Sequence, residues 1–314
     1  MVEMKQIAST NARLLGHMEV LQYIRQTKRM HPITFHLALT DKCNLSCKFC
    51  SVKNREMNEL ELVEAREIIQ EFEILGAKSV EITGGGDPCC YPYLGDVINF
   101  ATGHCGLAVG LITNGIDLPK VDHTALAKLN WLRISLSAVD FGLEDKLYKI
   151  DPLFLPTQTG CSYVYSKEEG TPENFLKAVE IAKYLKAKYL RLIPNCYTTE
   201  EVEWGKQNLP KMAAKYPDLV FDQVKEFNVP NQCYWRYMKP FVNSDGYVYQ
   251  CSTCALFAGK FSKPWRVCHW KDYFKLTLKK ATSFNTNKCS LCFYKEQNDL
   301  LADCLVDVQT PDFV

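Results

Sequence analysis

The sequence predicts an α/β fold: an open, partial (β/α)6 barrel of the TIM-like type, followed by a small cysteine-rich domain. From residue 33 onward, short apolar runs alternate about six times with longer amphipathic stretches. Such alternation is typical of parallel strands joined by right-handed helical crossovers. From about residue 225 the alternation stops, and the chain becomes rich in Cys, Asn, Lys and aromatic residues. Six units are too few for a closed eight-stranded barrel, so we expect an open one with its chemistry at the carboxyl ends of the strands.

The elements follow in order. We expect a helical lead-in over residues 1–32, the barrel over 33–224 and the second domain over 225–314. A long lid or binding loop is expected over residues 139–170, between the fourth and fifth strands. Strands are predicted within residues 33–40, 79–83, 107–113, 131–137, 189–194 and 219–224, and helices, from apolar residues spaced by three and four, within 58–76, 94–103, 172–187 and 199–216.

Composition excludes several classes of partner. The 314 residues carry a formal net charge of +1, so no overall field favours nucleic acid or a membrane surface. The chain shows no signal-peptide pattern at its start and no run of about 18 apolar residues. We therefore expect a cytoplasmic protein with neither nucleic acid nor membrane as a partner.

Cysteine is over-represented, with fifteen residues in the chain. The number is odd, the chain is too long to need disulfide bridges, and the expected compartment is reducing. The thiols are therefore interpreted first as metal ligands.

Three of these cysteines, Cys43, Cys47 and Cys50, lie in the loop after the first predicted strand, with Phe49 before the last. Three thiolates on one loop can hold three irons of a [4Fe–4S] cluster and leave the fourth iron open to another ligand. A partial zinc site or a set of redox thiols is the alternative. The spacing, the aromatic residue and the position after a strand together favour the cluster.

This loop resembles the CxxxCxΦC signature of the radical SAM superfamily, where Φ is an aromatic residue. The resemblance implies that S-adenosylmethionine (SAM) completes the cluster held by Cys43, Cys47 and Cys50. It also implies reductive cleavage of SAM to a 5′-deoxyadenosyl radical, which abstracts a hydrogen atom from the substrate. A reductant such as flavodoxin or ferredoxin would supply the electron.

Weaker matches to the same family follow the later strands. A glycine-rich segment and an acidic residue follow the second strand, Asn-Gly ends the third, and hydroxyl or charged residues end the fourth and fifth. A plain turn, a structural Asn-Gly pair and a solvent-facing arginine are the alternatives at these places. The resemblance implies cofactor contacts from Phe49, Gly84, Gly85, Gly86, Asp87, Asn114, Ser135, Ser137 and Arg191.

The C-terminal cysteines resemble an auxiliary-cluster extension of the SPASM or twitch type. We expect one auxiliary [4Fe–4S] cluster on Cys233, Cys251, Cys289 and Cys292. Cys254 is a possible substitute for one of them. A zinc ribbon is the alternative, because the pairs 251/254 and 289/292 both have CxxC spacing. The other C-terminal thiols, Cys268 and Cys304, are interpreted as structural.

The expected substrate is a small molecule with a planar heterocycle, because aromatic residues gather near the predicted strand ends. Asp222, Glu226 and Tyr234 are the candidate substrate contacts. The architecture also resembles that of queuine lyases, which implies a lyase reaction that releases a 7-deazaguanine base for salvage. The alternatives are a SPASM-type peptide- or protein-modifying enzyme, another lyase, an epimerase or an oxidoreductase. A non-catalytic zinc- or iron–sulfur-binding module is the alternative from another class.

Overall fold

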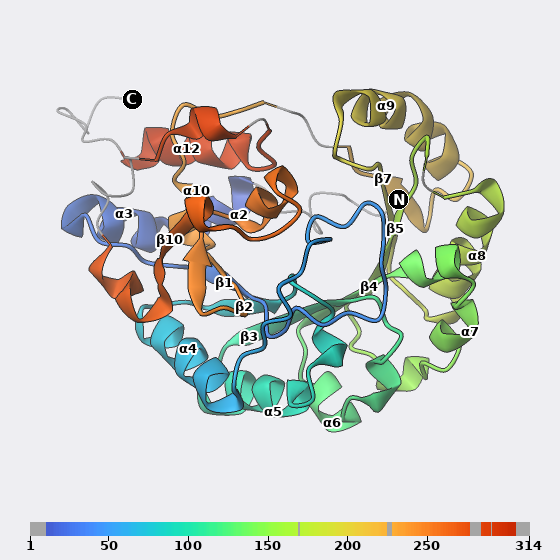
Figure 1. Ribbon diagram of the computed structural model, residues 1–314, viewed down its shortest axis with the longest axis horizontal. Helices are drawn as coiled ribbons and strands as arrows, with labels where there is room; N and C mark the ends of the chain where they lie inside the picture. The colour runs from blue at the N-terminus through green and yellow to red at the C-terminus, as the bar shows by residue number, and fades with distance from the viewer. Residues whose placement is uncertain (1–10, 169, 225–227, 277–283, 290, 306–314) are drawn as a thin grey trace.

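A computed structural model describes residues 11–168, 170–224, 228–276, 284–289 and 291–305. Its centre is one ten-stranded sheet with the order β10-β9-β8-β1-β2-β3-β4-β5-β6-β7. The strands from β1 to β7 run parallel and curve into an open barrel (Figure 1). The strands are β1 (Thr34–Leu37), β2 (Ser79–Ile82), β3 (Ala108–Thr113), β4 (Trp131–Ser135), β5 (Thr159–Val164), β6 (Leu190–Ile193), β7 (Val220–Asp222), β8 (Phe241–Val242), β9 (Tyr247–Tyr249) and β10 (Arg266–His269).

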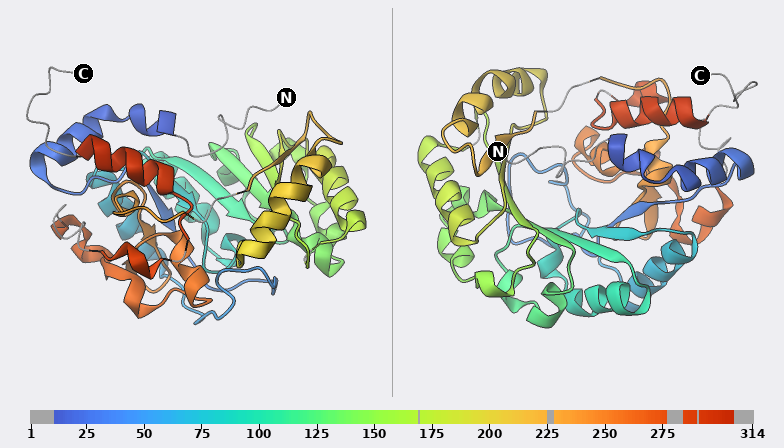
Figure 2. Two further views of the ribbon diagram at one scale, coloured as in Figure 1. Left: turned by 90° about the horizontal axis from the view of Figure 1, so that it is seen from above. Right: turned by 180° about the vertical axis from the view of Figure 1, so that it is seen from behind.

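Helices cover the outer side of the barrel, and the C-terminal segments lie across its open side (Figures 1 and 2). Helix α12 packs against α2 and α3, so the two ends of the described chain meet. The α-helices are α2 (Asn11–Leu15), α3 (Met18–Thr27), α4 (Leu62–Ile74), α5 (Leu94–Asn99), α6 (His123–Leu126), α7 (Glu144–Leu147), α8 (Pro172–Tyr184), α9 (Thr199–Ala213), α10 (Trp235–Met238) and α12 (Lys295–Leu305). No helix in these described ranges is long and apolar enough to cross a bilayer.

Alternation along the strands separates an apolar outer face from a polar inner face. On the outer face, Phe35 of β1 stacks on Phe72 of α4 with 4.6 Å between ring centroids. Ile134 of β4 lies on the same outer face, beside Leu147 of α7. Because successive strand residues point to opposite faces, the neighbouring His36 and Arg133 point to the concave, inner side. The barrel interior is therefore lined by polar and charged side chains.

The predicted fold class is confirmed, with one correction to the elements. All six predicted strand segments contain a strand, but the expected loop over residues 139–170 is wrong: it contains α7 and the strand β5. All six residues of β5 are buried, and small residues make up half of "TGCSYV". The segment therefore lacks the apolar–polar alternation that predicts a strand, and Val164 is its single branched apolar residue. Between residues 33 and 224 the described chain contributes seven consecutive parallel strands, β1 to β7, instead of six.

The chain beyond residue 225 joins the same sheet. Strand β8 pairs with β1 in parallel, with Leu37 opposite Val242, and β9 and β10 continue the sheet in antiparallel fashion. The first barrel strand is thus flanked on one side by β2 and on the other by the C-terminal segment. The domain boundary at residue 225 stays a prediction.

Candidate metal centres

The three cysteines of the first loop lie together at the carboxyl end of β1. Each is half-buried, and the amide of Cys50 donates to the carbonyl of Cys47 at 3.1 Å. Burial, followed by the neighbouring Cys50 and Cys43 thiols, raises the pKa of Cys47 to about 12. The three thiols are therefore close enough to influence one another electrostatically. A bound metal cation would reverse this unfavourable electrostatic situation, because coordination deprotonates a thiol outright.

Four side chains from other parts of the sequence contact this loop. Arg55 Nη2 donates to Cys50 Sγ at 3.4 Å, and Asn114 Nδ2 lies 3.8 Å from Cys43 Sγ. Tyr197 donates its hydroxyl to the carbonyl of Cys50. Ser137 hydrogen-bonds to Cys47. The loop is thus held by residues that follow β3, β4 and β6, and its sulfurs receive N–H and O–H donors of the kind that tune iron–sulfur clusters.

The predicted glycine segment packs directly on the cysteine loop. Gly84 and Gly85 have φ values of 81° and 65°, a region that favours glycine. The amide of Gly86 donates to the carbonyl of Thr40 at 2.7 Å. A Cβ atom on Gly86 would lie 1.8 Å from the carbonyl oxygen of Lys42. The glycines therefore let the second strand's loop approach the backbone of the first, and the cofactor contacts predicted for them stay a prediction.

Asp87 is buried and organises the same corner. Its carboxylate accepts from the amides of Cys89 and Asn114 at 2.9 and 2.6 Å and from the hydroxyl of Thr113 at 2.8 Å. Burial raises the pKa of Asp87, whereas the donors from Asn114, Thr113 and Cys89 oppose that rise. The side chain thus fixes the end of β3, including the predicted Asn114, beside the cysteine loop. Its predicted cofactor contact stays a prediction.

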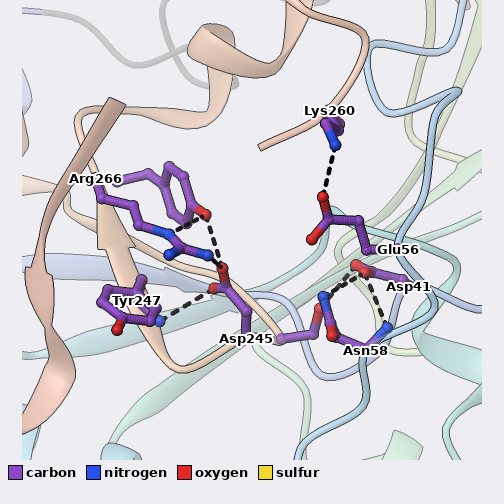
Figure 3. A network of polar contacts seen from close by, with 9 residues as sticks. Asp41, Glu56, Asn58, Asp245, Tyr247, Lys260 and Arg266 are labelled. Carbon is purple, nitrogen blue, oxygen red and sulfur yellow. Dashed lines mark hydrogen bonds and ion pairs between the residues drawn. The ribbon is translucent and has the colours of Figure 1, made fainter. Parts of the chain in front are cut away.

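The flanks of the cysteine loop are bound to the C-terminal segment, as Figure 3 shows. Ser244 donates to Asp41 Oδ1 at 2.7 Å, and the amide of Asn58 donates to Asp41 Oδ2 at 3.1 Å. Farther along, Lys260 pairs with Glu56 at 2.6 Å. The loop is therefore clamped between the barrel and the turn that follows β8.

A second cysteine-lined cavity lies in the C-terminal segment. Apolar and aromatic residues, including Trp235, Trp265 and Tyr294, complete its wall. Burial is the main cause, and the neighbouring Cys251 thiol the next, that raises the pKa of Cys233 to about 12. The four thiols that line the cavity are Cys233, Cys251, Cys289 and Cys292, which are the four predicted auxiliary ligands. Their chemistry fits an iron–sulfur cluster, and ligation itself stays a prediction.

The remaining C-terminal thiols lie elsewhere. Cys254 is buried and donates to the carbonyl of Cys251 at 3.0 Å, so the 251/254 pair does not turn both sulfurs into the cavity. Cys268 lies on β10 and Cys304 on α12. A zinc ribbon needs four sulfurs about 2.3 Å from one ion. In the ranges that the structure describes, no group of three or more His, Cys, Asp or Glu side chains is arranged to hold a single metal ion.

The other predicted contact residues lie in different parts of the structure. Ser135 and Ser137 hydrogen-bond to each other at 2.8 Å, although Ser137 lies in a 3-10 turn after β4 and not in the strand. Asp222 ends β7, in register with the outward-facing Leu192. Tyr234 is buried; its backbone amide donates to Asn298 Oδ1 at 2.6 Å, and its hydroxyl donates to Gln232. Glu226 lies outside the described residues, and Phe49 is half-buried in the loop.

Sequence reasoning did not identify several residues near these centres. Arg55 and Tyr197 contact the cysteine loop through the fold and have no motif of their own. Arg191 was predicted, and it faces the barrel interior, where Nη1 donates to Gln223 at 3.0 Å. Arg133 was missed although the alternation of "WLRISLS" places it on the same face as Ser135. That alternation is the signal that could have identified it.

Comparison with known proteins agrees with this geometry. Residues 37–191, which include the cysteine loop and the glycine segment, match the model of the radical SAM superfamily. Mycofactocin maturase MftC of Mycobacterium tuberculosis is 32% identical over 108 residues, 34% of this chain and 27% of that protein. GTP 3′,8-cyclase of Synechococcus elongatus is 32% identical over 111 residues, 33% of this chain and 34% of the cyclase. These matches thus span only about a third of each relative.

Among solved structures, the fold is similar to Streptococcus suis SuiB bound to the precursor peptide SuiA. The TM-score is 0.60 at 16% identity, and the match covers 92% of this chain and 76% of SuiB. At this identity the likeness shows a shared fold. The family uses a [4Fe–4S] cluster together with SAM, which are the cofactors that the three-cysteine loop predicts. Over residues 37–191 the chain carries a radical SAM domain.

Proposed function

We propose that this radical SAM enzyme modifies a peptide or protein substrate, with a catalytic [4Fe–4S] cluster on Cys43, Cys47 and Cys50. The adjacency of the three-cysteine loop and the glycine segment carries the proposal for the catalytic centre. The cavity lined by Cys233, Cys251, Cys289 and Cys292 would hold one auxiliary [4Fe–4S] cluster. When bound, the catalytic cluster and SAM supply a 5′-deoxyadenosyl radical for hydrogen-atom abstraction.

The chain's own residues position and shield this chemistry. Arg55 brings a positive charge to Cys50 Sγ and also donates to the carbonyl of Gly85 at 3.4 Å, so it links the two loops. Asp87 and Asn114 fix the loop's other side. The contacts of Ser244 with Asp41 and of Lys260 with Glu56 hold the C-terminal segment beside the loop, where it would restrict the access of water and oxygen to the radical. We place the enzyme in the cytoplasm, with flavodoxin or ferredoxin as the reductant.

A peptide substrate is supported by the relatives rather than by a motif. One relative is a maturase by its name, and SuiB was solved with a precursor peptide. A second candidate class is nucleotides, because GTP 3′,8-cyclase shows the same identity of 32% over a similar length. None of these three proteins supports the queuine lyase interpretation. The lyase reaction and the small planar heterocycle therefore become the less favoured alternative.

The experiment is anaerobic reconstitution followed by incubation with SAM and dithionite. The wild type is expected to form 5′-deoxyadenosine, measured by chromatography. Single replacements of Cys43, Cys47 or Cys50 by Ala should reduce that product at least about a thousandfold, because the cluster that delivers the electron is lost. Cys105→Ala, at a half-buried thiol outside both centres, is the matched control.

Substrate class is tested in the same assay. Pools of synthetic peptides, GTP and queuine are added separately, and the rate of 5′-deoxyadenosine formation and the substrate mass are measured. A peptide that accelerates the reaction and changes mass would support the proposal. Acceleration by queuine or GTP, with all peptide pools inert, would overturn it. A reconstituted wild type that never cleaves SAM would contradict the catalytic assignment itself.

A further inference from the structure

The inner face of the barrel carries charged side chains that the proposed mechanism does not use. His36 on β1, Glu81 on β2, Arg133 on β4 and Arg191 on β6 all point to this side. The electrostatic influence of Arg133 reaches both His36 and Arg191, so the four side chains share one space. They come from four strands and lie below the loops that carry the cysteines.

Opposite charges pair only partly in this space. Glu81 accepts from Lys239 at 2.6 Å and from His36 Nε2 at 2.7 Å. Burial and the nearby Lys239 lower the pKa of His36, which favours its neutral form. The charge of Lys239 is therefore balanced by Glu81. The charges of Arg133 and Arg191 have no acidic partner among the contacts of the described residues.

Both guanidinium groups also retain hydrogen-bonding capacity. The Nε atoms of Arg133 and Arg191 are buried and have no acceptor within the described part of the chain. The Arg191 side chain is half-buried, and desolvation, followed by the charge of Arg133, lowers its pKa to about 9. Arg133 lies over the ring of Trp131 at 5.8 Å, and among the described residues Arg191 donates only to the neutral Gln223. Two half-buried cations on one face, each with a buried Nε atom that lacks an acceptor in the described residues, are unfavourable without a counter-charge, so an anionic ligand is expected to complete this arrangement.

We infer that Arg133 and Arg191 form an anion subsite inside the barrel that binds a carboxylate of the substrate. The source of that carboxylate, a peptide C-terminus or an acidic side chain, rests on the proposed peptide-modifying function. Planar guanidinium groups match carboxylates geometrically and can donate two parallel hydrogen bonds. The subsite would hold the substrate by its charge while the neighbouring carbon faces the radical.

The depth of Arg133 separates this subsite from the cofactor's own carboxylate. Ser137 contacts Cys47 and hydrogen-bonds to Ser135, so these two serines mark the level of the cysteine loop. Arg133 lies two residues before Ser135 on the same strand face, about 7 Å deeper in the barrel. SAM must stay at the level of the cluster to reach its open iron. A second anion is therefore the better occupant for Arg133.

The test uses the anaerobically reconstituted full chain and acetate as the probe. Thermal unfolding is followed by circular dichroism in acetate, in acetamide as the neutral analogue, and in chloride at equal ionic strength. Acetate should raise the unfolding midpoint of the wild type, and Arg133→Met or Arg191→Met should weaken its apparent affinity about tenfold. Each variant should also unfold at a higher temperature than the wild type in chloride, because an uncompensated buried charge is removed.

Arg266→Met is the matched control, since Arg266 already pairs with Asp245 at 2.7 Å. It should lower the midpoint in chloride and leave the acetate response unchanged. A merely structural role for Arg133 and Arg191 predicts the opposite, namely destabilised variants with an unchanged acetate response. That result, or a wild type that responds equally to acetate and acetamide, would overturn the inference.

Two further measurements distinguish the sources of the anion. If saturating SAM abolishes the acetate response and R133M weakens SAM binding about tenfold, the carboxylate is that of SAM and the substrate assignment is wrong. A stronger response to inorganic phosphate than to acetate would overturn the carboxylate assignment and favour nucleotides. Because no turnover is needed, the subsite can be confirmed even if every peptide pool is inert, and such a pair of results would reject only the peptide.

Discussion

Gly86 shows how a single residue determines the geometry of the candidate radical centre. Its backbone lies against Lys42, and a Cβ atom there would meet the carbonyl oxygen at 1.8 Å and the carbonyl carbon at 2.4 Å. Backbone cannot move aside as the end of a flexible side chain can. Lys42 immediately precedes Cys43, so a displacement at this point would move the first thiol.

Gly86→Ala is therefore expected to separate the two loops. We predict a loss of about 3 kcal/mol of unfolding free energy and little iron in the catalytic site, because overpacking against backbone must shift one loop. Iron content and urea unfolding of the anaerobic protein measure the two effects. Gly103→Ala is the control, since nothing lies within 4 Å of its Cβ position, and it should retain full iron. A G86A protein with wild-type iron would show that the close packing is dispensable.

At the residue scale, the sequence predicted contacts within a motif but not contacts between residues that share no motif. Cys43, Cys47 and Cys50 share one loop, so their spacing alone brings them together. Tyr197 contacts Cys50 from 147 residues away, and no local pattern predicts that contact. Arg55 is only five residues beyond Cys50, but it belongs to no motif. The hydrogen bonds of Asp87 were also not predictable from the sequence, because its partners Thr113 and Asn114 lie at the end of a different strand.

Among the elements, strand β1 depends on an internal ion-pair group to hold its neighbours. Glu81 on β2 binds His36 on β1 and Lys239, which precedes β8. Burial alone would raise the pKa of Glu81, but Lys239 and His36 lower it below its ordinary value of 4.5. The stability from this group is thus present above about pH 4.5 and is lost as the pH falls toward the lowered pKa.

Lys239→Met should destabilise the protein by about 3 kcal/mol, because it leaves Glu81 as a buried charge with reduced compensation. Adding Glu81→Gln to this variant should recover more than half of the loss, since the remaining charge is removed. Urea unfolding at neutral pH gives both values. If the two single losses simply add in the double variant, the pair does not hold β8 to the barrel.

The elements that the sequence predicted have a regular spacing of apolar residues, and those that it did not predict lack one. Helices α4 and α8 carry regular apolar spacing, and both lie within predicted segments. Strand β5 is buried on both faces by the elements around it, so its small and polar residues gave no strand signal. The pairing of β8 with β1 joins residues about 200 positions apart, and no local pattern can predict such a pairing.

For the whole molecule, one apolar cluster links the two cysteine sites. It contains Ala38, Val52, Phe241, Phe261 and Trp265, among others. Cys50 of the first loop and Cys251 and Cys289 of the second cavity all pack against it. The four cavity cysteines come from three separate stretches of the C-terminal chain, so a cluster bound there would cross-link them.

Replacement of Cys251 by Ala is expected to lower the iron content from about eight to about four per chain and to reduce the unfolding temperature. Cys254→Ala is the matched control from the same CxxC pair, because its buried thiol faces the carbonyl of Cys251. Iron and acid-labile sulfide analysis measures the difference. Equal losses in both variants, or zinc in place of iron, would contradict the proposed ligand set.

The pairing of β8 with β1 also sets an order of events during synthesis. Strand β1 is made early, yet one of its edges stays open until Val242 has left the ribosome, about 200 residues later. At 5–20 residues per second, that interval is about 10–40 seconds. Throughout it, Ser244 and Lys260 are not yet present to clamp the cysteine loop. The nascent chain thus exposes its first three thiols to iron–sulfur delivery before its own C-terminal third closes over them.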